Sequence, residues 1–127
     1  MSIKFSVVSR KNPRDLESPP KYYPSINSDD LADLRRIARR IGEISTVHST
    51  DILASLEGLL TVLPQELADG NSVQLGDLGY FRLTAETEGA ATPEEVTEEN
   101  ILKVHVRFKP GKLFEEALQK LEFKKIE

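Results

Sequence analysis

The stretch LADGNSVQLGDLGYF, residues 67–81, decides the fold. It starts at the end of an apolar-periodic segment. Gly70 is the residue type that most often ends a helix, because glycine adopts a left-handed backbone without steric cost. A strand-like alternation of apolar and polar residues begins at Val73. Gly76 and Gly79 then bracket two residues, which is typical of a β-hairpin turn. The stretch therefore predicts a helix, a stop and a hairpin in immediate succession.

Two helices are predicted upstream of this stretch. The first covers residues 28–43, where Asn27 or Ser28 can cap it and three aspartates suit the positive end of the helix dipole. Its apolar residues recur at the 3.6-residue spacing of one helix face: Leu31, Leu34, Ile37, Ala38 and Ile41. Four arginines occupy the opposite side, and we interpret them as a solvated face: Arg35, Arg36, Arg39 and Arg40.

The second helix is predicted to run from a cap at His48 or Ser49 to Ala68, with Asp51 in its first turn. Pro64 should interrupt or kink it, because proline has no amide hydrogen and clashes with the preceding turn. Its apolar side chains cover about half of the helix circumference. They are Ile52, Leu53, Leu56, Leu59, Leu60, Val62, Leu63 and Leu67. A surface helix of a small monomer shows a narrower stripe, so we expect a second subunit to cover this one.

The outer segments alternate between strand-like and irregular patterns. Residues 3–9 alternate apolar and polar side chains and are predicted as a strand. Residues 10–24 hold four of the seven prolines and are interpreted as an exposed connector without regular structure. Residues 101–108 alternate again, and the turn KPGK separates them from an amphipathic helix over 113–121. The last stretch, LEFKKIE at 121–127, is predicted as a short strand that could pair with the first strand.

Composition limits the classes of function. The chain has 127 residues, 39% apolar and 30% charged, which suits one folded domain. It has no cysteine, so disulfides and thiolate metal sites are excluded, and two histidines do not suggest a protein-built zinc site. The sequence shows neither a signal peptide nor an apolar window of about eighteen residues. We therefore expect a cytoplasmic protein.

Charge is unevenly distributed along the chain, whose net charge is −4. Residues 1–50 carry nine basic and six acidic side chains, residues 51–100 one and eleven, and residues 101–127 seven and four. Six glutamates and no Lys or Arg fall in residues 84–100, between two strand-like runs. The acidic balance argues mildly against bulk nucleic-acid binding, but the two ends of the chain can still form a local basic patch.

The order of these elements resembles the HU family of bacterial histone-like DNA-binding proteins, which includes integration host factor. The resemblance is carried by LADGNSVQLGDLGYF, by RFKPGK at 107–112 and by ISTVHSTD between the two helices. The span between the two strands is also about as long as the family's β-ribbon arm. Leu78 stands where the family usually has Phe. The resemblance covers roughly residues 31–121, and the flanking segments look like the extended HU-related branch of Bacteroidetes-type bacteria.

The resemblance implies an α+β fold: an HU-like intertwined homodimer with a helical body, an antiparallel β-sheet saddle and a β-ribbon arm. We expect this domain over residues 28–121, with its arm at about 84–100. An N-terminal extension over 1–27 (a strand and a Pro-rich connector) and a C-terminal extension over 122–127 should add β-structure. The resemblance also implies non-specific binding of double-stranded DNA, and DNA condensation, in the bacterial nucleoid. In the family, arms enter the minor groove and proline wedges kink the duplex.

The arm departs from the family's pattern. The family's arm is rich in Arg and Lys, whereas Thr84, Ala85 and Glu86 stand at the matching positions here. Pro93 at the tip is followed by two glutamates. Each close glutamate–phosphate pair is repulsive at roughly the 1 kcal/mol scale even in screened solution. The sequence therefore predicts that this arm does not grip DNA as a typical HU arm does.

Cations remain on the strands beside the arm. The family places phosphate-contacting lysines in its FKPGK turn, which corresponds to Lys109 and Lys112 here. Lys103 and Arg107 share the non-core face of the strand that leads into the turn, and Arg82 lies on the outer face of the strand before the arm. We predict that these five residues line the saddle and contact phosphates without reading bases. DNA binding would then be weak, non-specific and salt-dependent; an ordinary solvated strand face is the alternative.

Other interpretations stay open. A protein-interaction module on the same fold would use residues 84–100 to bind a basic protein partner, having lost DNA binding. An enzyme is not expected, because neither His48 nor His105 has a nucleophile or an acid arranged around it. No cofactor or metal site is predicted. Tyr22 and Tyr23 are interpreted as packing against a sheet, with base stacking as the alternative.

Overall fold

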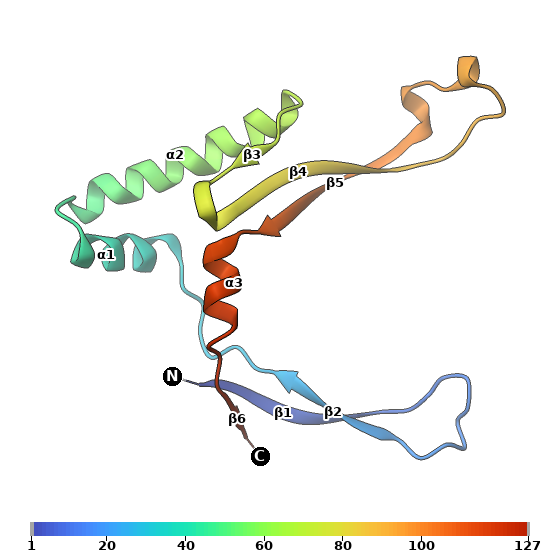
Figure 1. The fold of residues 1–127 in the computed structure, drawn as a ribbon, viewed down its shortest axis with the longest axis horizontal. Coiled ribbons are helices and arrows are strands. Elements are labelled where there is room, and N and C mark those ends of the chain that lie inside the picture. Colours follow the sequence, from blue (N-terminus) through green and yellow to red (C-terminus); the bar gives the residue numbers. More distant parts are fainter. Residues whose placement is uncertain (1, 127) are drawn as a thin grey trace. The chain divides into compact units, whose positions relative to one another are not determined.

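A computed structural model describes residues 2–126 (Figure 1). Within that range there are three α-helices and two three-stranded sheets, so the expectation of an α+β fold is confirmed. The chain divides into two units: Met1–Asp33 with Leu118–Glu127, and Leu34–Ala117. Each unit is described by itself below.

Helix α1 spans Leu34–Ile44 and begins six residues later than predicted. The predicted cap does not form, because Asn27 is bound to the first strand instead. Its amide donates to the Lys4 carbonyl at 2.9 Å, and its side-chain oxygen accepts from the Ser6 hydroxyl at 3.3 Å. The Asp30 carboxylate also accepts from the Leu31 amide, a local bond that competes with helix formation. Leu31, predicted on the apolar stripe, lies outside the helix and is exposed.

Helix α2 spans Ser49–Ala68, as predicted. The helix continues through Pro64, so the expected interruption is wrong. At its end the Gly70 amide donates to the Leu67 carbonyl and the Asn71 amide to the Glu66 carbonyl, both at 3.0 Å. Gly70 has φ +91°, the left-handed conformation that this pair of bonds requires. The predicted stop is therefore confirmed.

The predicted hairpin follows as β3 (Val73–Gln74), the short 3₁₀ turn η1 (Gly76–Leu78) and β4 (Gly79–Thr87). Strand β5 (Ile101–Pro110) pairs antiparallel with β4, giving the sheet order β3-β4-β5.

Two glycine turns meet at the base of this sheet, which explains why GDLG and KPGK occur together. The Gly111 amide donates to the Leu78 carbonyl at 2.9 Å. A Cβ on Gly111 would collide with the Asp77 carbonyl, and one on Gly79 with the Lys109 carbonyl. Gly79 also has φ +143°, which side chains rarely allow. Only glycine lets the two turns approach this closely. Helix α3 (Lys112–Leu118) starts directly after them.

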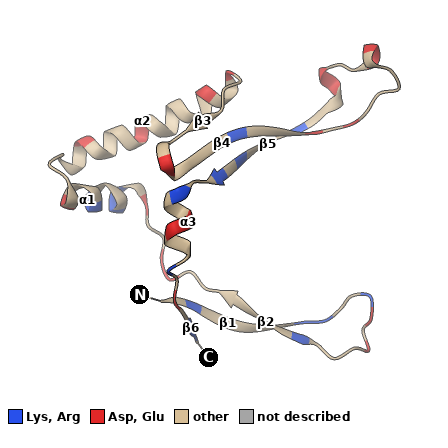
Figure 2. Ribbon diagram, viewed as in Figure 1, with Lys and Arg blue, Asp and Glu red and all other residues tan. Residues whose placement is uncertain are grey.

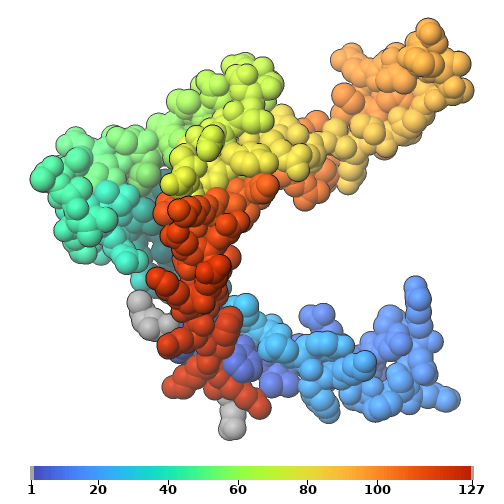
Figure 3. Space-filling view, viewed as in Figure 1, coloured from blue at the N-terminus to red at the C-terminus, as the bar shows by residue number. Residues whose placement is uncertain are grey.

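The acidic tip, which we define as residues 88–100, has regular local structure. It contains two 3₁₀ turns, η2 (Pro93–Glu95) and η3 (Glu98–Asn100), which the sequence patterns did not indicate. The Glu88 amide donates to the Asn100 carbonyl at 2.9 Å, and the Asn100 side-chain amide donates back to the Glu88 carbonyl at 3.2 Å. Thr97 and Asn100 form a reciprocal cap on η3. These bonds close the tip across its two strands, and Figure 3 shows it extending away from the helices of the same unit.

The other unit contains the sheet β2-β1-β6, formed by β1 (Ile3–Arg10), β2 (Lys21–Ile26) and β6 (Phe123–Lys125). The predicted pairing of the C-terminal strand with the first strand is confirmed, and it is parallel. The prediction of no regular structure over 10–24 is wrong for its second half, because β2 begins at Lys21. Pro24 is tolerated there because β2 is an edge strand, where a missing amide leaves no ladder bond broken.

Few apolar side chains of the described residues are buried: Ala38, Ile52 and Leu67. Phe81 and Phe108 stack on the apolar face of β4–β5 with ring centroids 4.8 Å apart. Much of the remaining apolar surface of the Leu34–Ala117 unit faces solvent, including Leu60, Val62, Leu83, Val104 and Val106. An open hollow of about 330 Å³ separates the end of α2 from the β4–β5 face, and its lining is almost wholly apolar. A helix and a sheet with this much uncovered apolar surface are typical of one half of a larger core.

Candidate nucleic-acid interface

The polar face of β4–β5 brings together four of the five predicted site residues. Arg82 lies opposite Arg107, and Lys109 lies opposite Tyr80. Lys103 lies opposite Glu86 further along the ribbon. Because side chains alternate across a strand, these positions share one face, with Phe81 and Phe108 on the other. We call Arg82, Lys103, Arg107 and Lys109 the basic strand face. Figure 2 colours the Lys and Arg positions along β4 and β5 blue.

The centre of the basic strand face is a like-charged pair. Arg82 and Arg107 are direct cross-strand neighbours, and both are exposed. Neither guanidinium has an ion pair among residues 2–126. Like charges directly opposite each other destabilise a sheet. An arrangement of this kind is relieved when an anion binds between the two side chains, and a phosphodiester is such an anion.

The two lysines at the turn have different surroundings. Lys109 Nζ lies 5.9 Å from the centroid of the Tyr80 ring, a cation–π contact that keeps the ammonium on the basic strand face. Lys112 is the first residue of α3 rather than a strand residue, so it is not part of that face. Its Nζ lies 3.9 Å from Glu116 Oε1, an exposed i,i+4 pair that partly offsets its charge.

A contact between His105 and Glu86, which the sequence patterns did not indicate, lies on the β4–β5 ribbon where its basic part meets its acidic part. His105 Nε2 lies 3.0 Å from Glu86 Oε1. The two residues are diagonal neighbours, because His105 pairs with Thr84 in the register. Only the strand register places them together, so no local sequence signal could have found the pair. Beyond it every glutamate of the acidic tip is exposed.

Comparison with known proteins identifies the family and the fold of this chain. The family model HU-HIG, described as an HU domain fused to a wHTH, Ig or glycine-rich motif, matches residues 1–125. The chain belongs to the HU-HIG family. The resemblance to HU proteins is thereby confirmed, and it extends over both units of this HU-HIG chain. No curated protein matches the HU-HIG chain.

A solved structure shares the fold of the HU-HIG chain. It is a protein of Bacteroides vulgatus, described as a candidate bacterial DNA-binding protein, with a TM-score of 0.65 and 17% sequence identity. The match covers 98% of this chain and 48% of the neighbour, so the HU-HIG chain spans about half of that protein's length. At this identity the likeness shows the fold.

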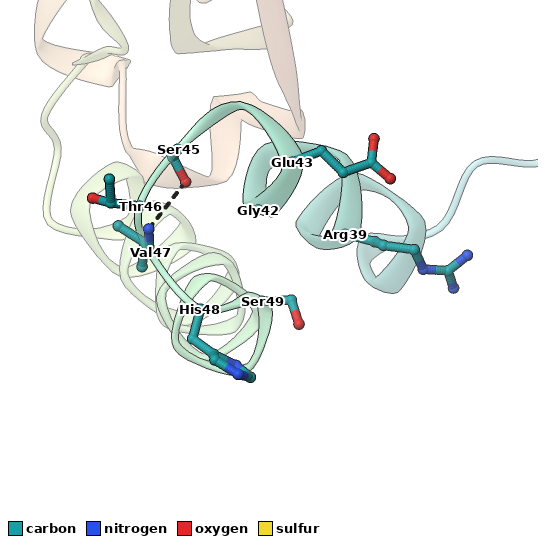
Figure 4. A pocket seen from close by; sticks show the side chains of 8 residues that line it. All are labelled: Arg39, Gly42, Glu43, Ser45, Thr46, Val47, His48 and Ser49. Atoms are coloured by element: carbon teal, nitrogen blue, oxygen red, sulfur yellow. Dashed lines mark hydrogen bonds between the residues drawn. The ribbon is translucent and has the colours of Figure 1, made fainter.

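Outside the basic strand face, the helical part of the HU-HIG chain has a hollow of its own. A shallow hollow lies at the corner between α1 and α2, lined by Arg39, Glu43 and His48 among others (Figure 4). The Ser45 hydroxyl there accepts from the Val47 amide at 3.3 Å, which shapes the corner. His48 holds the N-cap position of α2, but its side chain makes no capping bond. Among residues 2–126 no cluster of three metal-ligating side chains is present, and no helix is long and apolar enough to cross a membrane.

Proposed function

We propose that this HU-HIG chain binds the backbone of double-stranded DNA through the basic strand face, with Lys112 at its end, weakly and without sequence preference. The observation that carries the proposal is the exposed Arg82–Arg107 pair, which has no ion-pair partner in the part of the chain that the structure describes. Two guanidinium groups on a strand face bind phosphate oxygens well and read no base edge from there. A role in coating or condensing DNA in the bacterial nucleoid follows from such binding.

The acidic tip takes no part in this grip. Its glutamates lie beyond the His105–Glu86 contact, on a tip that is closed by its own hydrogen bonds. Each glutamate brought near a phosphate costs roughly 1 kcal/mol. The proposed contact with DNA therefore ends near Lys103, and the affinity is lower than that of an arm rich in cations.

The DNA-binding form is proposed to be a homodimer. The apolar hollow beside Leu63, Leu67 and Phe81 is open, and Leu60 and Val62 on α2 are about half exposed. Exposed apolar surface of this extent is unfavourable in a monomer. A second copy that inserts its own apolar side chains would complete the core and place two basic strand faces on one assembly.

Charge reversal on the basic strand face tests the DNA proposal. R107E/K109E/K112E should abolish retention of a short duplex in a gel-shift series at low salt, because attraction becomes repulsion. A matched triple reversal at Arg35, Arg39 and Arg40 on α1 controls for net charge. Unchanged duplex retention by R107E/K109E/K112E would overturn the assignment of the face.

A second candidate function is a protein-interaction module whose acidic tip binds a basic protein. The ordered turns of the tip favour it, because they present Glu94, Glu95, Glu98 and Glu99 on a fixed backbone. Replacement of residues 88–100 with a Gly/Ser linker separates the two functions. DNA affinity should rise under the first proposal, whereas a basic partner should be lost under the second.

A further inference from the structure

The β1–β2 hairpin of the N-terminal unit contains a second concentration of basic side chains. A hollow of about 700 Å³ opens beside the loop that joins the two strands, and no carboxylate lines it. The lining residues that matter are cations, neutral polar groups and one ring: Arg10, Lys11, Asn12, Ser18, Lys21 and Tyr23. The lining of the hollow therefore presents positive charge and hydrogen-bond donors, and the two carboxylates of the loop, Asp15 and Glu17, are not part of that lining.

The strand register places like charges together here as well. Arg10 pairs directly with Lys21 at the end of the hairpin. Among residues 2–126 neither side chain has an ion pair, and Lys11 has none either. The Arg10 guanidinium lies 5.7 Å from the centroid of the Tyr23 ring, which keeps it beside the hollow. As with Arg82 and Arg107, such a pair is relieved by an anion that lies between the two side chains.

The loop is held in shape before any ligand arrives. The Arg14 amide donates to Asn12 Oδ1 at 2.9 Å, and the Ser18 hydroxyl donates to the Asp15 carbonyl at 2.8 Å. The Asp15 carboxylate accepts from the Glu17 amide at 3.2 Å, so this negative group is engaged in its own turn. A loop ordered in advance loses little conformational entropy on binding.

We propose that this hollow is a second contact for the phosphates of duplex DNA. The identity of the ligand rests on the proposed function, but the contact lies on a different unit from the basic strand face and carries its own residues. Lys11 and Lys21 neutralise phosphates, Arg10 offers its fork of donors, and the side-chain amide of Asn12 adds a neutral donor. Arg10 and Lys21 lie on the two strands, Lys11 follows β1, and all three side chains are exposed. An open arrangement of this kind suits the extended phosphate backbone of a duplex better than a single small anion, which would need an enclosed site. The N-terminal unit thereby supplies basic contacts that the acidic tip lacks.

The test compares two double variants of the full chain that lose the same charge. K11Q/K21Q removes two cations of the hollow, and K120Q/K125Q removes two exposed cations of the same unit outside it. Duplex affinity is measured by anisotropy from 20 to 200 mM salt. For K11Q/K21Q we expect affinity at 100 mM to fall about ten-fold or more, and the slope of log K against log salt to decrease by about two. K120Q/K125Q should stay within about two-fold of the unmodified chain. Circular dichroism melting checks that both variants fold.

Parallel measurement of R82Q/R107Q separates this inference from the proposed function. If K11Q/K21Q binds like the unmodified chain while R82Q/R107Q is weakened, the hairpin contact is wrong and the proposed function stands. If only K11Q/K21Q is weakened, the hairpin contact stands and the basic strand face is wrong. If the unmodified chain does not bind the duplex at 20 mM salt, both are wrong. The amide NMR shifts of the hairpin loop are also followed during titration with the duplex and with inorganic phosphate. If millimolar inorganic phosphate alone produces the same shift changes as the duplex, the hollow is a small-anion site and the DNA assignment is overturned.

Discussion

Single residues at the base of the β3-β4-β5 sheet explain why two distant sequence fragments occur together. Gly79 and Gly111 let the GDLG and KPGK turns meet, and the Gly111–Leu78 hydrogen bond joins them. This junction sets the register that puts Arg82 opposite Arg107. A substitution at the junction should therefore affect both the stability of the sheet and the basic strand face.

At Gly79 the expected result is a large loss of stability. Gly79→Ala adds a Cβ that meets the Lys109 carbonyl and the Phe108 ring, at a φ of +143°. We expect the free energy of unfolding to fall by about 2 kcal/mol or more, from strain and overpacking. Urea denaturation followed by circular dichroism measures it. Gly89→Ala, in the acidic tip with open space around it, should change stability by less than about 0.5 kcal/mol. Equal losses in the two variants would contradict this account.

At the scale of elements, sequence periodicity located most helices and strands but not all of their limits. The start of α1 was misplaced because Asn27 is held by Lys4 and Ser6, a contact across the chain that no local pattern shows. Strand β2 was missed because Pro24 reads as a loop residue unless the strand is known to be an edge. The alternation of apolar and polar residues in β5 correctly predicted that Lys103 and Arg107 share one face of the strand. The position of Arg82 directly opposite Arg107 depends on the strand register, which no pattern within one strand can predict.

The acidic tip is the element whose charge should limit affinity. E94Q/E95Q/E98Q/E99Q removes four negative charges from it. If the tip repels the duplex by about 1 kcal/mol in total, affinity at low salt should rise about five-fold. Fluorescence anisotropy with a short duplex measures the change. A fall in affinity would mean that the tip contributes to the grip.

The hydrogen bonds that close the acidic tip should stabilise the tip itself and contribute little to the free energy of global unfolding. Asn100→Ala removes the side-chain bonds to Glu88 and to the Thr97 amide. Amide hydrogen exchange at Glu88, Thr97 and Asn100 should speed up several-fold, since about 1 kcal/mol of local stability is lost. Global unfolding should shift little, because every residue of the tip except Asn100 is exposed. Glu99→Ala, which keeps these bonds, is the control; unchanged exchange in Asn100→Ala would contradict the role of Asn100.

At the scale of the whole molecule, the exposed apolar surface is the feature that one chain alone does not explain. Leu60 and Val62 on α2 and Val104 and Val106 on β5 are about half exposed. The wide apolar stripe of α2 already indicated this surface from the sequence, and these side chains remain exposed among the residues that the structure describes. Membership of the HU-HIG family and the proposed homodimer are consistent with it.

The homodimer leads to a prediction about mass in solution. Sedimentation at micromolar concentration should show twice the chain mass of 14.2 kDa. Leu60→Asp should shift the equilibrium toward monomer or unfold the chain, because a buried unpaired carboxylate costs several kcal/mol. Glu57→Asp, on an exposed position of the same helix, should leave the mass unchanged. A stable, folded monomer of the unmodified chain would contradict the proposed homodimer.

The central claim is that the basic strand face neutralises DNA phosphates, and the salt dependence of duplex binding by R82Q/R107Q tests it most directly. The slope of log K against log salt should decrease by about two relative to the unmodified chain, because two phosphate contacts are lost. An unchanged slope and affinity in R82Q/R107Q would contradict it.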